Sequence, residues 1–253
     1  MLKYASLLAL AAPLHAAEFK RELSTDRPDT TESAYSVEAG HFQVESSIWA
    51  FSRDRSEGVK TETWTLGEMN LKAGLTDCHD LQLVLRPWIH EQNDEGETSE
   101  GFGDIEMRLK WNLWGNDGGK TAGAVMPWVS IPTQPAVSTG EWEGGVIFPV
   151  AFELSEKLGL GVQAETVRAW DDDNGRYDWE LLHSITLGIS VTETIGCFVE
   201  YVGVTGGESY EATANTGITW APTENLQWDL AVGIGINDAA EDFSIAQGVS
   251  FRF

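Results

Sequence analysis

The stretch from Asp104 to Leu113 constrains the fold more than any other part of the sequence, because polar and apolar side chains alternate in it without a break. The polar members are Asp104, Glu106, Arg108, Lys110 and Asn112, and the apolar members are Ile105, Met107, Leu109, Trp111 and Leu113. A period of two places the two sets on opposite faces of one β-strand. Charged groups need water, whereas Ile, Leu and Trp need an apolar environment. One face therefore meets water and the other meets a second sheet or lipid.

The same alternation recurs along most of the chain after Gly40. Residues 158–165, 226–236 and 243–253 each carry one apolar face and one face of small or polar side chains. No window has a convincing helical period. The sequence therefore predicts an all-β protein.

The spacing of turn residues distinguishes a soluble sandwich from a membrane barrel. Connections that alternate between longer and shorter ones are expected along the chain. The longer ones are 52–60, 92–102, 133–142, 171–176, 206–210 and 237–242, and the shorter ones are 76–80, 116–119, 155–157, 192–194 and 222–225. Such an asymmetry is typical of an up-and-down antiparallel transmembrane β-barrel of about twelve strands, with both chain ends on the side of the short turns. A Greek-key sandwich does not produce it.

The first residues resemble a secretory signal peptide. Lys3 is followed by an apolar run over residues 4–14 and by Ala16 and Ala17. The run is shorter than the roughly 20 residues that a membrane-spanning helix needs. We therefore expect a signal peptide over 1–16, with cleavage after Ala16 or Ala17, a polar N-terminal segment over 17–40 and a barrel over 41–253. Export through this signal to the outer membrane of a Gram-negative cell is the expected localisation.

The charge balance restricts the partners. The chain has 16 Lys and Arg against 40 Asp and Glu, a formal net charge of -24, which excludes nucleic acid as a partner. Outer-membrane lipid and lipopolysaccharide are the expected surroundings, although acidic exported proteins also use charge simply for solubility. The terminal Phe253, preceded by Phe251, resembles the signal read by the barrel-assembly machinery. Several of the 11 tryptophans fall near expected strand ends, where a membrane boundary would hold them.

No catalytic, metal or cofactor site is expected. Cys78 and Cys197 are placed far apart around the barrel, so two free thiols are expected rather than a disulfide, and the 5 histidines show no ligand spacing near either of them. His183 is expected to face lipid, as in membrane-barrel lipid hydrolases. Its neighbours on that face offer no nucleophile, and no Gly-x-Ser-x-Gly turn is present, so an enzyme is not expected.

Several phrases resemble a known family. They are Ser24-Thr25-Asp26-Arg27-Pro28-Asp29, the entry into the first strand over residues 37–45, Gly74-Leu75-Thr76-Asp77 and Gly101-Phe102-Gly103-Asp104. The chain resembles the outer-membrane β-barrel transporter family named for the meta-cleavage pathway of phenol degradation, and Cys78-His79 departs from its pattern. The resemblance implies a barrel that carries small molecules, including aromatic ones.

Alternation also predicts which side chains face the lumen. Candidates for the permeation path are Arg86, His90, Asp104, Glu106, Arg108, Lys110, Glu165, Glu180 and Asp229. The basic residues among them could guide an anionic solute. Alternatively, they form a structural ladder of ion pairs with Asp104 and Glu106.

The polar segment before the barrel is a candidate plug. We expect it to enter the barrel, with Asp26, Arg27, Pro28 and Asp29 as plug residues and Arg27 paired to luminal carboxylates. The alternative is a tail outside the barrel. Inward glycines at 159, 161, 188, 217, 233 and 235 would leave space on one wall.

Two functions follow from these expectations. The first is a channel or transporter for small, aromatic or poorly soluble molecules, which diffuse passively through a narrow polar lumen. The second is a closed barrel with a structural or interaction role in the cell envelope. The sequence does not identify the solute.

Overall fold

The computed structural model describes residues 19–56, 58–133, 136–138, 140–172, 174–206 and 209–253, so the expected signal peptide lies outside the described residues. Across the described residues the chain forms 14 strands in one sheet. No helix among them is long and apolar enough to cross a membrane. The strands are β1 (Phe42–Ser56), β2 (Val59–Thr76), β3 (His79–Leu85), β4 (Trp88–Asn93), β5 (Thr98–Gly101), β6 (Ile105–Trp114), β7 (Thr121–Ile131), β8 (Glu143–Ser155), β9 (Leu158–Asp171), β10 (Arg176–Ser190), β11 (Ile195–Thr205), β12 (Glu211–Thr223), β13 (Leu226–Gly235) and β14 (Phe243–Arg252).

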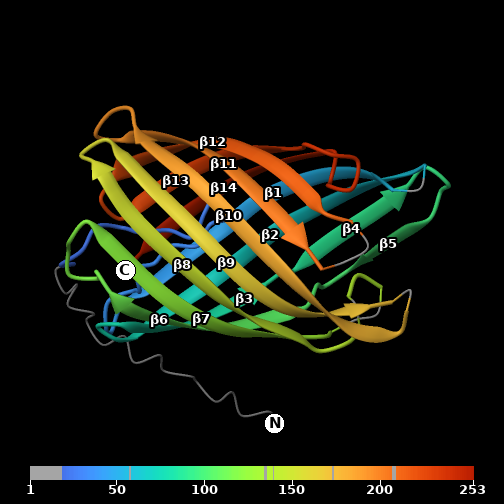
Figure 1. Cartoon of the computed structure of the whole chain (residues 1–253), viewed down its shortest axis with the longest axis horizontal. Helices are drawn as coiled ribbons and strands as arrows, with labels where there is room; N and C mark the ends of the chain where they lie inside the picture. Colours follow the sequence, from blue (N-terminus) through green and yellow to red (C-terminus); the bar gives the residue numbers. More distant parts are fainter. Residues whose placement is uncertain (1–18, 57, 134–135, 139, 173, 207–208) are drawn as a thin grey trace, which may run out of the picture.

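The sheet closes on itself as an antiparallel barrel (Figure 1). Strand β1 pairs with β14 on one side and with β2 on the other, which leaves neither as an edge. Strands β3 and β4 pair with successive lengths of β2, and β6 and β5 pair with β3 and β4 in turn. Strands β3 and β4 therefore together form one interrupted strand of the wall, and β5 and β6 together form the next. The barrel has 12 strands, as the sequence predicted.

The two ends of the barrel differ. We call the end where β1 begins and β14 ends the terminal end, and the opposite one the loop end. At the terminal end the backbone amide of Phe42 donates to the carbonyl of Phe253 at 3.0 Å, and the amide of Phe253 donates to Phe42 at 2.9 Å. The longest connection, 132–142, lies at the loop end.

The expected asymmetry of the connections holds only in part. At the loop end Ser56 pairs directly with Val59, so the long first loop predicted over 52–60 is wrong. The 94–97 connection at the same end is also shorter than the 115–120 connection at the terminal end. Arg53, Asp54 and Arg55 resemble a loop in sequence, yet they continue β1, because ladder hydrogen bonds need no apolar side chains where the strand stands in water.

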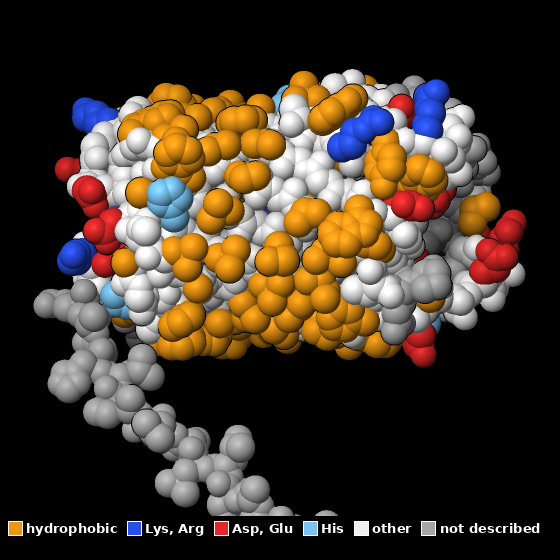
Figure 2. Space-filling view, turned by 90° about the horizontal axis from the view of Figure 1, so that it is seen from below, with side chains coloured by type: hydrophobic (Ala, Val, Ile, Leu, Met, Phe, Trp, Pro, Cys, Tyr) orange, Lys and Arg blue, Asp and Glu red, His pale blue; other side chains and the backbone are white. Residues whose placement is uncertain are grey.

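Side chains are distributed as in a membrane barrel. In β6 Lys110 is 1% exposed, whereas its neighbour Trp111 is 48% exposed. The space-filling view shows apolar side chains over the middle of the outer surface and charged ones near both ends (Figure 2). A soluble protein buries the opposite set. The apolar outer band therefore spans a membrane, with polar side chains turned to the lumen.

The alternation of inward and outward side chains reverses at one level of the wall, so that residues of β1 and β2 beyond this level face the opposite side from the one that the sequence pattern predicts. Ser47 pairs with Glu68 and Trp49 with Leu66, which leaves Ile48 opposite Gly67, a glycine with φ of 67°. The next strand is interrupted at the same level, between β3 and β4.

This phase change corrects one expectation, the inward orientation of His90. Its partner across the ladder is Trp64, which is 41% exposed on the outer face and packs on Phe51 with ring centroids 4.9 Å apart. Paired residues lie on the same face of a sheet. His90 therefore lies on the outer face, stacked on Trp88.

The cysteines are both free, as expected. Cys78 lies in the turn between β2 and β3, and Cys197 lies in β11.

Candidate functional site

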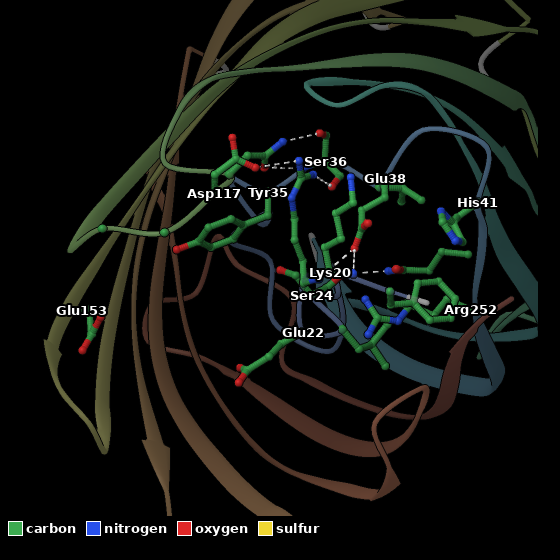
Figure 3. A pocket seen from close by; sticks show the side chains of 18 residues that line it. Lys20, Glu22, Ser24, Tyr35, Ser36, Glu38, His41, Asp117, Glu153 and Arg252 are labelled. Carbon is green, nitrogen blue, oxygen red and sulfur yellow. Dashed lines mark hydrogen bonds and ion pairs between the residues drawn. The ribbon is translucent and has the colours of Figure 1, made fainter. Parts of the chain in front are cut away.

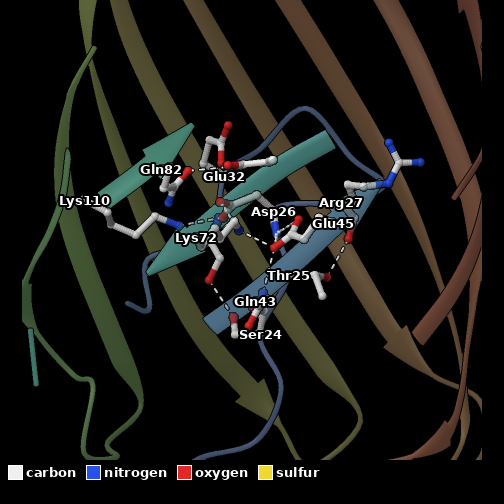
Figure 4. A network of polar contacts seen from close by, with 12 residues as sticks. Ser24, Thr25, Asp26, Arg27, Glu32, Gln43, Glu45, Lys72, Gln82 and Lys110 are labelled. Atoms are coloured by element: carbon white, nitrogen blue, oxygen red, sulfur yellow. Dashed lines mark hydrogen bonds and ion pairs between the residues drawn. The ribbon is translucent and has the colours of Figure 1, made fainter. Parts of the chain in front are cut away.

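Residues 19–41 run through the barrel lumen as a chain without regular secondary structure (Figure 4). Their backbone amides donate mostly to side chains of the wall rather than to a neighbouring strand. The amide of Val37 donates to Asp80 at 2.9 Å, that of Glu32 to Gln163 at 2.7 Å and that of Thr31 to Glu200 at 2.8 Å. Inward side chains from at least three strands thus accept hydrogen bonds from the backbone of a segment that is not itself part of the β-sheet. We call residues 19–41 the luminal segment.

Asp26 is the centre of the buried ionic network. Its carboxylate pairs with Lys72 and, at 2.6 Å, with the ammonium of Lys110, and both lysines are nearly inaccessible. Its backbone amide donates to Glu45 Oε2 at 3.0 Å. Burial alone would raise the pKa of Asp26, but the ammonium groups of Lys110 and Lys72 hold it well below its usual range. Asp26 is therefore charged in place.

Arg27 lies against β1, β13 and β14. Its guanidinium donates to both oxygens of Asp229, at 2.8 and 3.4 Å, and to the hydroxyl of Ser47. It lies directly over Gly248, where an added Cβ would be 2.3 Å from Nη2. The structure thus places Arg27 against a luminal carboxylate, and only glycine at 248 leaves room for it. The Arg27–Pro28 peptide bond is cis.

Glu200 holds the next part of the luminal segment. Its carboxylate accepts the backbone amides of Thr30 at 2.9 Å and Thr31 at 2.8 Å, and the hydroxyl of Thr31 at 2.7 Å. The side-chain amide of Asn215 donates to it at 2.8 Å. Every one of these donors is neutral, and within the described part of the chain no cationic side chain forms an ion pair with Glu200.

The basic candidates are all engaged in ion pairs. Arg86 pairs with Glu68 at 2.8 Å, and Arg108 pairs with Glu106 and with Glu32 of the luminal segment. Of the ladder that the sequence left as one of two alternatives, the structure contains the Arg108–Glu106 pair, whereas Arg86 and Lys110 pair with Glu68 and Asp26. Asp104 is not part of it, because its carboxylate accepts the amide of Thr133 at 3.0 Å.

The remaining acidic candidates lie toward the loop end. The carboxylate of Glu165 accepts a hydrogen bond from Nε1 of Trp128 at 2.8 Å. Glu180 is in electrostatic contact with Glu211, Glu143 and Asp178, which makes the loop-end mouth acidic.

Some residues of the site were not singled out from the sequence. Alternation also predicts inward positions for Glu45, Lys72 and Glu200, although they were not among the candidates for the permeation path. Thr30 and Thr31 carried no signal, because their contacts depend on where the luminal segment docks.

Cavities lie beside the luminal segment, among them three that differ in their lining residues. The first, of about 740 Å³, lies at the terminal end among Lys20, Glu38 and Arg252 (Figure 3). There the carboxylate of Glu38 accepts the backbone amides of Lys20 at 2.9 Å and Arg21 at 2.8 Å. The second, of about 570 Å³, follows the wall of β8 to β11, and the third, of about 310 Å³, lies toward the loop end.

The glycines that were expected to face the lumen differ in how much space they leave. Gly159 and Gly188 have almost empty space where a Cβ would stand, and Gly161 abuts Thr31 and Thr186. Gly217, in contrast, lies beneath the ring of Phe198, and Gly235 abuts the backbone of the loop that follows it. The predicted open space is thus present at Gly159 and Gly188 but not at Gly217 or Gly235.

Comparison with known proteins identifies the family. A family model described as "Putative MetA-pathway of phenol degradation" matches residues 25–253. The chain belongs to this family. The resemblance drawn from Asp26-Arg27-Pro28 and the other phrases is thereby confirmed. No protein with a curated description matches the sequence.

Solved structures share the fold of this phenol-degradation family member at low sequence identity. An outer membrane channel from Pseudomonas putida F1 matches with a TM-score of 0.65 and 15% identity, over 87% of this chain and 98% of the channel. The NanC porin matches with a TM-score of 0.55 and 9% identity, over 83% of this chain and 98% of the porin. The translocator domain of the autotransporter NalP from Neisseria meningitidis matches with a TM-score of 0.52 and 10% identity, over 85% and 90%. These likenesses concern the fold, because such barrels have different uses.

Proposed function

We propose that this family member is an outer-membrane channel through which small molecules diffuse passively. The observation that carries the proposal is the space beside the luminal segment. The second cavity lies mainly along β8 to β11 and the third along β1, β2 and β12 to β14, and both leave room for a solute while residues 19–41 stay docked. A barrel with a purely structural role has no need of such space, since side chains can fill a narrow lumen.

The composition of the lumen also supports a channel. Lys72, Lys110, Glu45 and Asp229 are all buried. Charged groups inside a membrane protein are energetically costly and typically belong to solute pathways. The proposed location in the outer membrane follows from the fold shared with outer-membrane barrels and from the expected signal peptide. Lipid, lipopolysaccharide and the barrel-assembly machinery are its proposed partners there.

The proposed solutes are small, and aromatic compounds are the first to examine. The phenol-degradation description of the family motivates this choice. In the second cavity Tyr35 and Phe198 offer aromatic surface beside polar groups. A hydroxylated aromatic ring needs both kinds of contact. We propose no catalytic role.

Liposome swelling tests this function. Refolded mature protein would be reconstituted and exposed to a size series of sugars, amino acids and phenolic compounds. Swelling with the smaller solutes, decreasing as solute size grows, is the expected result. Liposomes that do not swell with any solute, although they contain folded barrel, would favour a closed structural barrel instead.

A further inference from the structure

The second and third cavities meet at the luminal segment. The second is lined by Lys157 and Ser190 at the terminal end and extends inward to Asp29. The third is lined by Glu241 at the loop end and extends inward to Thr30. Pro28 lines both cavities. Residues 28–30 therefore form the constriction between two compartments that together extend from one end of the barrel toward the other.

Two glycines leave the wall of the second cavity open between the terminal end and this constriction. Nothing lies within 4 Å of an added Cβ at Gly159, and only the carbonyl of Gly159 lies near one at Gly188, at 3.9 Å. The space narrows at Gly161, where a Cβ would be 2.8 Å from Thr186 and 3.0 Å from Thr31. The open route thus follows the wall at β9 and β10 before it reaches the constriction.

The charge around the constriction is unbalanced. Asp29 lines the second cavity and is in electrostatic contact with Glu200, another carboxylate. Arg27 is engaged by Asp229. The hydroxyl of Thr186, which lines the same cavity, is buried beside the Asp29 carboxylate. Oxygen atoms that are negative or can accept a hydrogen bond therefore face the route.

Lys157 lines the second cavity at the terminal end, whereas the two buried lysines of the lumen are occupied elsewhere. Lys72 pairs with Asp26 and Glu45, and Lys110 pairs with Asp26. Lys110 projects from β6, which lines neither cavity, and Lys72 lies near the terminal end of β2. The third cavity meets β2 only at Thr63 and Thr65, toward the loop end. The two buried lysines therefore lie apart from the route. The carboxylates along the route outnumber its two basic side chains, Arg27 and Lys157; these carboxylates are Glu22, Asp29, Glu153, Glu156 and Glu241.

We infer that solutes cross between these two compartments past residues 28–30 while the luminal segment remains docked, and that Asp29 makes the route select cations, small organic ammonium compounds included, over anions. The inference rests on the proposed channel function. Carboxylates in a narrow space raise the local concentration of cations and exclude anions. The hydroxyl of Thr186 lies beside Asp29 and offers a second polar contact to an ammonium group that Asp29 attracts.

Reversal potentials in planar bilayers test the role of Asp29. With a KCl gradient at about pH 8.5, where carboxyl groups are ionised, the wild-type protein should be cation-selective. Asp29→Asn should lower the ratio of cation to anion permeability several-fold. Glu193→Gln, which removes an exposed carboxylate in the turn between β10 and β11, is the matched control and should leave the ratio unchanged.

The outcomes separate this inference from the proposed function. A folded wild-type barrel without conductance contradicts the channel function itself. A conducting barrel that is anion-selective, or whose selectivity is the same with Asn at 29, contradicts only the role of Asp29.

Bulky substitutions test the route. Gly159→Phe and Gly188→Phe place a ring in the second cavity where the wall is open, and should lower single-channel conductance several-fold. Ala164→Phe is the control, because Ala164 pairs with the outward Phe148 and His183. Conductance that is equal in all three variants and the wild type would overturn the route along this wall.

Discussion

Asp26 of the luminal segment and Lys110 of β6 meet at 2.6 Å inside the barrel, and both are nearly inaccessible to solvent. The two residues are distant in sequence, and Lys72 of β2 completes the contact. Burial of an ion pair is favourable only when every partner is present. This contact therefore fixes the luminal segment to one side of the barrel.

Asp26→Asn should loosen the luminal segment. The substitution leaves Lys72 with Glu45 alone and Lys110 without its carboxylate, and removing one partner from a buried pair costs about 3–5 kcal/mol. We expect residues 19–41 to become sensitive to protease in detergent-solubilised protein, followed by mass spectrometry, while the barrel still migrates as folded on unheated gels. Glu193→Gln is the control, and protection equal to that of the wild type would contradict the anchoring role of Asp26.

Gly248→Leu should displace Arg27. A side chain at 248 would enter the space occupied by the guanidinium, which lies 2.3 Å from the position of the Cβ. Asp229 would then lose its cationic partner, and single-channel recordings should show a larger or less steady conductance. Val249→Leu, on the outward face of the same strand, is the control. A Gly248→Leu channel identical to the wild type would show that Arg27 does not restrict the lumen.

Docking of the luminal segment should weaken as pH rises from about 4 to about 7. Burial and the nearby Glu200 carboxylate raise the pKa of Asp29 to about 7 in the docked state. A carboxyl group whose pKa is higher in the docked state than in the undocked state favours docking while it is protonated, and a pKa difference of one corresponds to about 1.4 kcal/mol. The docked state is therefore most stable at low pH, and this contribution is lost once pH exceeds about 7.

Protease sensitivity of residues 19–41 measured between pH 4 and 8 checks this dependence. Sensitivity should increase over that interval in the wild type and change little in Asp29→Asn. A wild-type profile that is flat, or that runs in the opposite direction, would contradict the assignment to Asp29.

The barrel could be predicted because alternation acts locally. In β6 and β14 each side chain is assigned to water or lipid by its own position, so the inward placement of Lys110 and the outward placement of Trp111 needed no knowledge of neighbouring strands. The prediction for His90 was wrong because the phase change at Ile48, Gly67 and the break after Leu85 involves three strands at once. Gly67, with its positive φ, and Pro87, between β3 and β4, signal such a break only when the register of the strands is known.

The luminal segment shows where sequence reasoning stops. Asp26 and Arg27 were identified as candidates, but their partners Lys110 and Asp229 come from strands far along the chain. The sequence around Asp26 does not alternate between polar and apolar residues, so it does not predict which way this side chain points. The position of Asp26 is set only once the barrel has closed around it. The cavities depend on the same docking, so neither the constriction at Pro28 nor the separation of Asp29 from the two lysines could be predicted from the sequence.

Single-channel conductance of the wild type and of a deletion of residues 18–39 tests most directly whether the luminal segment narrows the channel. We expect a small, steady conductance for the wild type and a clearly larger one for the deletion, with heat-modifiable gel mobility confirming that both barrels are folded. A folded deletion variant with the same conductance as the wild type would contradict the claim that residues 19–41 restrict the lumen.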